Sequence, residues 1–174
     1  MPAPGSINST RPLLSAGIVV ALLLGGCGQE GGSSDPGKTQ LTAATLGEQS
    51  ILATAEYLAA SPYAEADLEL GSRQARVCMA CHTLDAGGVN MLGPNLHGMF
   101  GRAAGRMPGF QFSKALSSAE FTWTPRALDA WLQAPATFLP GNRMAFAGVA
   151  KEENRNALIA FLISETAADS DEAP

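Results

Sequence analysis

Three segments after residue 65 show the apolar periodicity of helices, and the alanine-rich stretches of the chain also favour helix over sheet. The first segment extends from Leu70 to Val77. The second begins at Thr124-Pro125, a pair that suits the N-cap and first position of a helix, and Pro135 closes it. Its apolar face consists of Leu128, Trp131 and Leu132.

The third helix is predicted over Glu152 to Ser164, where acidic residues at the start suit the positive end of the helix dipole. Leu158, Phe161 and Leu162 fall on one face of it. The loops between the helices are long and rich in Gly and Pro, which would be unusual in a domain without a bound group. We therefore predict an all-α domain over residues 66–165, with short helices and long loops wrapped around a cofactor. Without that cofactor, we expect the chain to be largely unfolded.

The segment from Leu41 to Ala60 is also apolar and alanine-rich. We predict a helix there that starts from Ser50 and ends before Ser61-Pro62. We see no chemistry in this segment and interpret it as a spacer helix within a tether over residues 27–65. The apolar positions at helical spacing are Ile51, Leu52, Ala55 and Leu58.

A run of apolar and small residues, Leu13 to Gly26, follows Arg11, the only charged residue before it. A run of about 14 residues is shorter than the roughly 20 that a transmembrane helix needs. It suits the apolar region of an export signal, which we predict for residues 1–26.

The run ends in Leu24-Gly25-Gly26-Cys27, which resembles the cleavage box of bacterial lipoproteins. In that family a diacylglycerol is attached to the cysteine, which becomes the new N-terminus, and two or three acyl chains give stable membrane attachment. The resemblance implies a lipid anchor on Cys27, followed by a flexible tether from Gly28 to Lys38. An ordinary signal peptide and an uncleaved anchor are the alternatives.

The formal net charge of −5 argues against a nucleic-acid binder. Residues 65–165 carry nine basic and nine acidic side chains, so the acidic excess lies in the N-terminal stretch and in the tail. We predict a disordered acidic tail over residues 166–174. The net charge is therefore a poor guide to the partners of the domain.

The three cysteines are too few for a disulfide framework or a four-cysteine zinc site. Two of them lie in Cys78-Met79-Ala80-Cys81-His82, the C-x-x-C-H attachment signature of c-type haem. The two thiols reach the vinyl groups on one porphyrin edge, and His82 then lies under the iron as an axial ligand. A thioredoxin-like pair or half a zinc site would share C-x-x-C, but no βαβ pattern surrounds it and no second cysteine pair follows. The motif predicts one covalent haem c, which is normally attached after export.

From about Leu68 to Leu162 the chain resembles the class I cytochromes c, the family of mitochondrial cytochrome c and its bacterial relatives. Many short motifs occur in the family's order and at its spacings, which makes the resemblance specific. They are Gly93-Pro94-Asn95-Leu96-His97-Gly98, Phe100-Gly101-Arg102, Gly105, Pro108-Gly109-Phe110, Phe121-Thr122-Trp123-Thr124, Trp131-Leu132 with Pro135, Pro140-Gly141-Asn142-Arg143-Met144, Phe146-Ala147-Gly148, Arg155 and Leu158-Ile159-Ala160-Phe161-Leu162.

The resemblance implies that Met144, in its Pro-Gly-x-x-Met setting, is the second axial ligand of the iron. A thioether is soft and neutral and favours ferrous iron, so a His/Met pair raises the reduction potential relative to two histidines. The other methionines after the haem motif lack this setting, and His97 occupies a structural, non-ligating position.

Other pocket roles follow from the same resemblance. The Pro94 carbonyl is expected to accept a hydrogen bond from the other ring nitrogen of His82, which fixes its tautomer. The expected donors to the haem propionates are Arg102, Trp123 and Asn142.

The aromatic positions both match and depart from the family. Phe146 is expected to cover the exposed haem edge near the methionine ligand. Trp131 packs on the methionine side where the mitochondrial type has a tyrosine, and Phe112 stands where the family often has a tyrosine, so two hydroxyls are absent and the potential should shift. Ala75 replaces an aromatic of the first helix. The lysine ring around the haem edge is largely absent, so partner surfaces inferred from it do not carry over.

The resemblance implies a single-electron carrier rather than an enzyme, lipid-anchored through Cys27 on the periplasmic side of a bacterial membrane. Its partners would be redox proteins, namely a quinol-oxidising complex, a terminal oxidase or a periplasmic dehydrogenase, with small transient contacts. No small-molecule substrate is expected. Two alternatives stay open: a haem-bearing subunit of an oxidase complex, and a haem enzyme or gas sensor if Met144 is labile.

Overall fold

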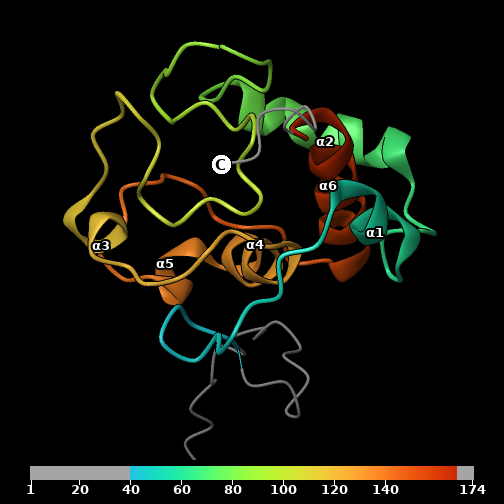
Figure 1. The fold of residues 1–174 in the computed structure, drawn as a ribbon, viewed down its shortest axis with the longest axis horizontal. Coiled ribbons are helices and arrows are strands. Elements are labelled where there is room, and N and C mark those ends of the chain that lie inside the picture. The colour runs from blue at the N-terminus through green and yellow to red at the C-terminus, as the bar shows by residue number, and fades with distance from the viewer. Residues whose placement is uncertain (1–39, 168–174) are drawn as a thin grey trace, which may run out of the picture. The chain divides into compact units, whose positions relative to one another are not determined.

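The helices predicted from the sequence are present in the computed structural model, which describes residues 40–167. Within this range, which belongs to the compact unit of residues 37–174, the chain forms helices and no strand (Figure 1). The predicted signal (1–26), Cys27, the tether up to Lys38 and the tail from residue 168 lie outside the described residues. None of the described helices is both long and apolar enough to cross a membrane. The helices are α1 (Thr54–Ala59), α2 (Leu68–Met79), α3 (Lys114–Ser117), α4 (Pro125–Gln133), α5 (Pro135–Phe138) and α6 (Glu152–Glu165).

Helices α2 and α6 make the most extensive helix contact in the described domain. A Cβ atom built on Gly71 of α2 would lie 2.2 Å from the carbonyl oxygen of Ala157 in α6, so only glycine permits this approach. Ala75 is completely buried at 0% exposure. The small side chains therefore let the backbones come close at a position where the resemblance led us to expect an aromatic residue.

Helix α4 begins as its capping residues predict. The side-chain oxygen of Thr124 accepts a hydrogen bond from the Ala127 N–H at 3.2 Å, and Pro125 is the first helical residue. Pro135 ends α4, as expected, and also starts the short helix α5. The face predicted to be apolar is buried at Leu128, Trp131 and Leu132.

The predicted spacer helix is wrong in its start and in its setting. Helix α1 begins at Thr54 rather than Ser50, because the Tyr57 hydroxyl accepts a hydrogen bond from Leu52 N (2.9 Å) and donates one to Ser50 O (3.1 Å), which holds the preceding residues extended. Tyr57 is 8% exposed and Leu46 is 1% exposed within the core. Helix α1 packs against α6, so this segment is part of the domain and not a spacer.

The prediction of a disordered tail from residue 166 is wrong at its first residue. Thr166 is completely buried, and its hydroxyl donates to the Leu162 carbonyl at 2.7 Å. The Thr166 carbonyl accepts a hydrogen bond from Gly98 N at 2.7 Å. The end of α6 is therefore fastened to the loop that follows the cysteine motif.

Candidate haem site

The C-x-x-C-H motif lies where α2 ends. Cys78 is in the last turn of the helix, and the Cys78 carbonyl accepts hydrogen bonds from both Cys81 N and His82 N at 3.0 Å. These bonds continue the turn past the end of the helix, so that both thiols and the imidazole arise from one turn. Cys78 and Cys81 are half-buried and form no disulfide with each other, and burial raises the pKa of the Cys78 thiol.

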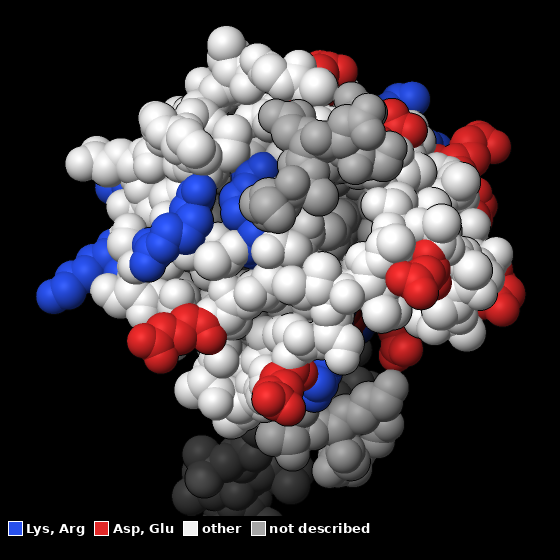
Figure 2. Space-filling model, viewed as in Figure 1, with Lys and Arg blue, Asp and Glu red and all other residues white. Residues whose placement is uncertain are grey.

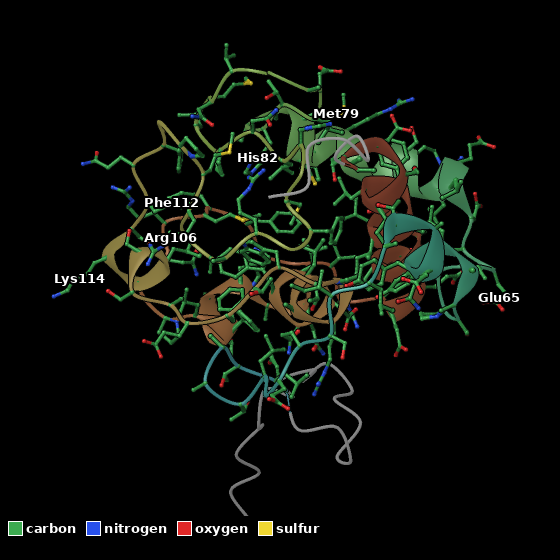
Figure 3. The ribbon with its side chains drawn as sticks, viewed as in Figure 1. Glu65, Met79, His82, Arg106, Phe112 and Lys114 are labelled. Atoms are coloured by element: carbon green, nitrogen blue, oxygen red, sulfur yellow. The ribbon has the colours of Figure 1, made fainter. Side chains whose placement is uncertain are left out.

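The His82 ring is fixed by the loop that faces it. Its Nδ1 atom lies 2.6 Å from the Pro94 carbonyl oxygen, which is the hydrogen bond that the resemblance implies. With the Nδ1 proton committed to this carbonyl, Nε2 keeps a lone pair for a metal. Burial lowers the pKa of His82, although the bond to Pro94 acts in the opposite direction, and the neutral ring is the ligating form. The side chain extends from the loop after α2 toward the middle of the domain (Figure 3).

Gly93 provides the space that this ring occupies. A Cβ atom at this position would lie 2.2 Å from Cε1 and 2.6 Å from each ring nitrogen of His82. Any other residue would displace the imidazole or the loop. Gly93 is therefore needed to leave room for the His82 ring. It lies in the Gly-Pro-Asn motif, but no role was predicted for it from the sequence.

Two asparagines that sequence reasoning left without a role hold the loop after the motif. Asn95 is 2% exposed, and its amide donates to the Thr83 hydroxyl (2.7 Å) and to the Asp85 carbonyl (3.0 Å). Asn90 accepts a hydrogen bond from Asn95 N (2.9 Å) and donates to the Pro108 carbonyl (3.1 Å). The only sequence signal was the position of Asn95 in the Gly-Pro-Asn motif, because its partners are distant in the chain.

The side chain of Asn142 is hydrogen-bonded to backbone groups of its own loop. Its amide nitrogen donates to the carbonyls of Pro135 and Leu139, both at 2.9 Å, and its oxygen accepts from Met144 N at 2.9 Å. Both amide hydrogens are directed to backbone carbonyls, so Asn142 holds its own loop, and its role as a propionate donor stays a prediction. It fixes the backbone of Met144, which packs partly buried against the core.

The other two predicted propionate donors lie side by side. Trp123 N donates to the Arg102 carbonyl and Gly101 N to the Trp123 carbonyl, each at 2.9 Å, around an antiparallel bridge between Ala103 and Thr122. The Arg102 guanidinium donates to the His97 carbonyl and keeps further N–H groups, while burial lowers its pKa. The structure thus brings Arg102 and Trp123 together.

Aromatic rings line the interior beside these donors. Trp131 is 4% exposed and packs edge-on against Trp123 at 5.4 Å between ring centroids. Phe146 is half-buried next to Met144, and Phe112 is half-buried with its ring 4.8 Å from that of Phe110. The pocket roles expected for Trp131 and Phe146 stay predictions.

The residues present fit a covalently attached haem. Two thiols and an oriented imidazole arise from one turn, a methionine is held on a fixed loop, and an arginine and a tryptophan supply hydrogen-bond donors. An all-α domain with this donor set defines a c-type cytochrome.

Comparison with known proteins assigns the chain to one family of that class. No family model matches the chain. It is 43% identical over 111 residues to cytochrome c of Chlamydomonas reinhardtii, covering 62% of this chain and 99% of the relative. It is 41% identical over 102 residues to cytochrome c2 of Agrobacterium tumefaciens, covering 57% of this chain and 92% of the relative. A cytochrome c homolog of Bradyrhizobium diazoefficiens is 43% identical over 100 residues, which cover 57% of this chain and 54% of the relative.

The chain belongs to the cytochrome c family. It binds one covalent haem c, and it is an electron-transfer protein that works with redox partners rather than an enzyme. The predicted fold class and cofactor are thereby confirmed.

Proposed function

We propose that the protein carries single electrons on a haem bound through Cys78 and Cys81, with His82 and Met144 as the axial ligands. The observation that carries this proposal is the 2.6 Å contact between His82 Nδ1 and the Pro94 carbonyl, which leaves Nε2 for the iron. The bound haem supplies an iron that alternates between the ferrous and ferric states. The protein holds the two axial side chains and surrounds them with apolar groups.

The support for Met144 comes from its loop. Asn142 fixes the Met144 backbone with a 2.9 Å hydrogen bond, and the side chain packs against buried core residues. A thioether held in apolar surroundings stabilises ferrous iron and so favours a high reduction potential.

The absorption spectrum of the reduced protein with and without carbon monoxide tests this ligation. An unchanged low-spin spectrum is expected for the native protein, because Met144 closes the sixth position. Met144→Ala should bind carbon monoxide and shift the Soret band, whereas Met107→Ala should behave like the native protein. A native protein that binds carbon monoxide would instead support a haem enzyme or gas sensor.

We also propose that the protein is exported and attached to the membrane by a lipid on Cys27. It would carry electrons between a quinol-oxidising complex and a terminal oxidase, or from a periplasmic dehydrogenase. The support is the apolar run that ends at Cys27 and the Gly- and Ser-rich stretch after it.

Cell fractionation of Cys27→Ala tests the anchor. Release of the variant from the membrane fraction is expected, and retention would rule out the lipid. Co-purification of the native protein with an oxidase after detergent extraction would favour the alternative of a fixed oxidase subunit.

A further inference from the structure

Large apolar side chains are exposed around the cysteine motif. Of the eight large hydrophobic residues exposed in the described part of the chain, five lie between residues 77 and 92. We refer to these five as the apolar rim. They are Val77 (57% exposed), Met79 (50%), Val89 (70%), Met91 (47%) and Leu92 (84%).

Hydrogen bonds place the two parts of the apolar rim beside the haem-attachment motif. Gly93 N donates to the Cys81 carbonyl and Thr83 Oγ1 to the Val89 carbonyl, both at 2.8 Å, so the loop of residues 89–93 lies along residues 81–83. Val77 precedes Cys78 in α2, and Met79 follows it. The rim therefore borders the segment to which the haem is attached.

The surface around the rim carries little charge. Asp85 is the only acidic or basic residue, histidines apart, between residues 77 and 101. One exposed basic side chain, Arg76, directly precedes Val77 in α2. Arg106 and Lys114 lie near α3, whereas Glu65 lies on the opposite side of the domain (Figure 3). Figure 2 shows a largely uncharged surface over the loop that follows α2.

We propose that the apolar rim is the docking surface for a redox partner protein whose own contact face is apolar and uncharged. Exposed apolar groups close together mark interaction sites, as with Val89, Met91 and Leu92 in one loop, and their burial is favourable without any opposite charge. A surface of a few residues suits the small interfaces of transient redox encounters. Docking at the rim would let one electron pass from the reduced haem to the partner's redox centre, so that the haem would be oxidised by one electron and the partner reduced by one, with no bond formed or broken. The inference rests on the proposed function, because the haem must be attached at Cys78 and Cys81.

The ionic-strength dependence of electron transfer provides the first test. The full-length, detergent-solubilised holoprotein is mixed with membranes of the cells that produce it, and its reoxidation rate constant is measured between about 20 mM and about 300 mM salt. An apolar interface predicts a change of less than about twofold, whereas electrostatic steering would reduce the rate by about tenfold or more.

Charge insertion into the rim provides the second test. Met91→Lys and Leu92→Lys should each lower the rate constant by about tenfold, because a charge is then buried in the complex. Ile51→Lys is the matched control, since Ile51 is 59% exposed and lies outside the rim, and its rate should be unchanged.

Three results would overturn the inference. A steep salt dependence with a loss of rate in Lys114→Glu would place docking on the basic side near α3. Binding of full-length Cys27→Ala holoprotein to phosphatidylcholine vesicles, abolished by Leu92→Lys, would make the rim a lipid contact. A dimer that Leu92→Lys dissociates would make it a self-association surface. A failure of the proposed function is distinguishable, because the protein would then lack covalent haem or bind carbon monoxide in its native form.

Discussion

The helices and the ligand-bearing loops of the domain are held by different kinds of interaction. Helix α6 is fixed by packing, with Leu158 and Ile159 at 0% exposure against its neighbours. The loops of residues 80–113 and 139–151 are fixed mainly by hydrogen bonds from single side chains such as Asn95 and Asn142 to backbone groups. Close packing stabilises the helices directly, whereas the loops have few buried side chains of their own and depend on the cofactor that they surround.

Loss of covalent haem should therefore lower the stability of the domain more than any other change. In Cys78→Ala/Cys81→Ala the loops lose the group they enclose, and the chain should lose its cooperative unfolding transition and most of its far-UV circular dichroism. Cys27→Ala is the control with a removed cysteine and should keep haem and helices. If the double variant still unfolded cooperatively, the loops would be stable without haem. The proposed difference between packed helices and cofactor-dependent loops would then be wrong.

The next largest loss of stability is expected for Arg155, the side chain that connects the helices to the loop of residues 139–151. Arg155 in α6 is 4% exposed and donates to Asp129 of α4 at 2.7 Å and to the carbonyls of Val149 and Ala150 at 2.9 Å. Arg155→Leu leaves these acceptors without their partner and should lower the free energy of unfolding by about 3 kcal/mol.

Denaturant unfolding of a second arginine variant supplies the control. Arg73 also forms a 2.7 Å ion pair, with Glu69, but both side chains are exposed at 49% and 86%. Arg73→Leu should therefore cost less than about 1 kcal/mol. Equal losses in the two variants would contradict the role assigned to burial.

The two regions also differ in how far the sequence predicted them. Helix α4 was predicted because its signals, Thr124 as cap and Pro125 as first residue, act within the helix itself. The haem motif was recognisable because its chemistry needs three residues within five positions of the chain. Local signals of this kind can be read from one segment alone.

The structure departs from the sequence-based expectations where individual hydrogen bonds, rather than periodicity, decide the conformation. Helix α1 starts late because the Tyr57 hydroxyl binds the backbone of residues 50 and 52, and Thr166 is ordered because Gly98 reaches its carbonyl. The hydrogen bonds of the Asn142 amide to two nearby carbonyls are likewise not predictable from the family motif. Periodicity and family motifs contain no information on such bonds.

A pair of glycine variants compares the two regions directly. Gly71→Ala places a Cβ atom 2.2 Å from the Ala157 carbonyl between α2 and α6, and should cost about 2 kcal/mol of stability with an unchanged haem spectrum. Gly93→Ala places one 2.2 Å from the His82 ring and should disturb iron ligation.

Thermal unfolding and carbon monoxide binding separate the two outcomes. Gly71→Ala should lower Tm without binding carbon monoxide, and Gly93→Ala should change the spectrum more than Tm. Ser72→Ala, next to Gly71 on α2, is the neutral control. A spectral change in Gly71→Ala as large as that in Gly93→Ala would show that the helical region and the loops respond as one unit.

The smallest expected effect concerns the contact between α4 and the N-terminal segment. Thr124 caps α4 and its hydroxyl also donates to Gln49 Oε1 at 2.5 Å. Thr124→Ala should cost about 1 kcal/mol in denaturant unfolding, and Thr124→Ser should restore it because the hydroxyl suffices for both bonds. Gln49→Ala removes only the second bond. If Gln49→Ala were as costly as Thr124→Ala, the stability at this site would come from the packing of the N-terminal segment on the domain rather than from the cap of α4.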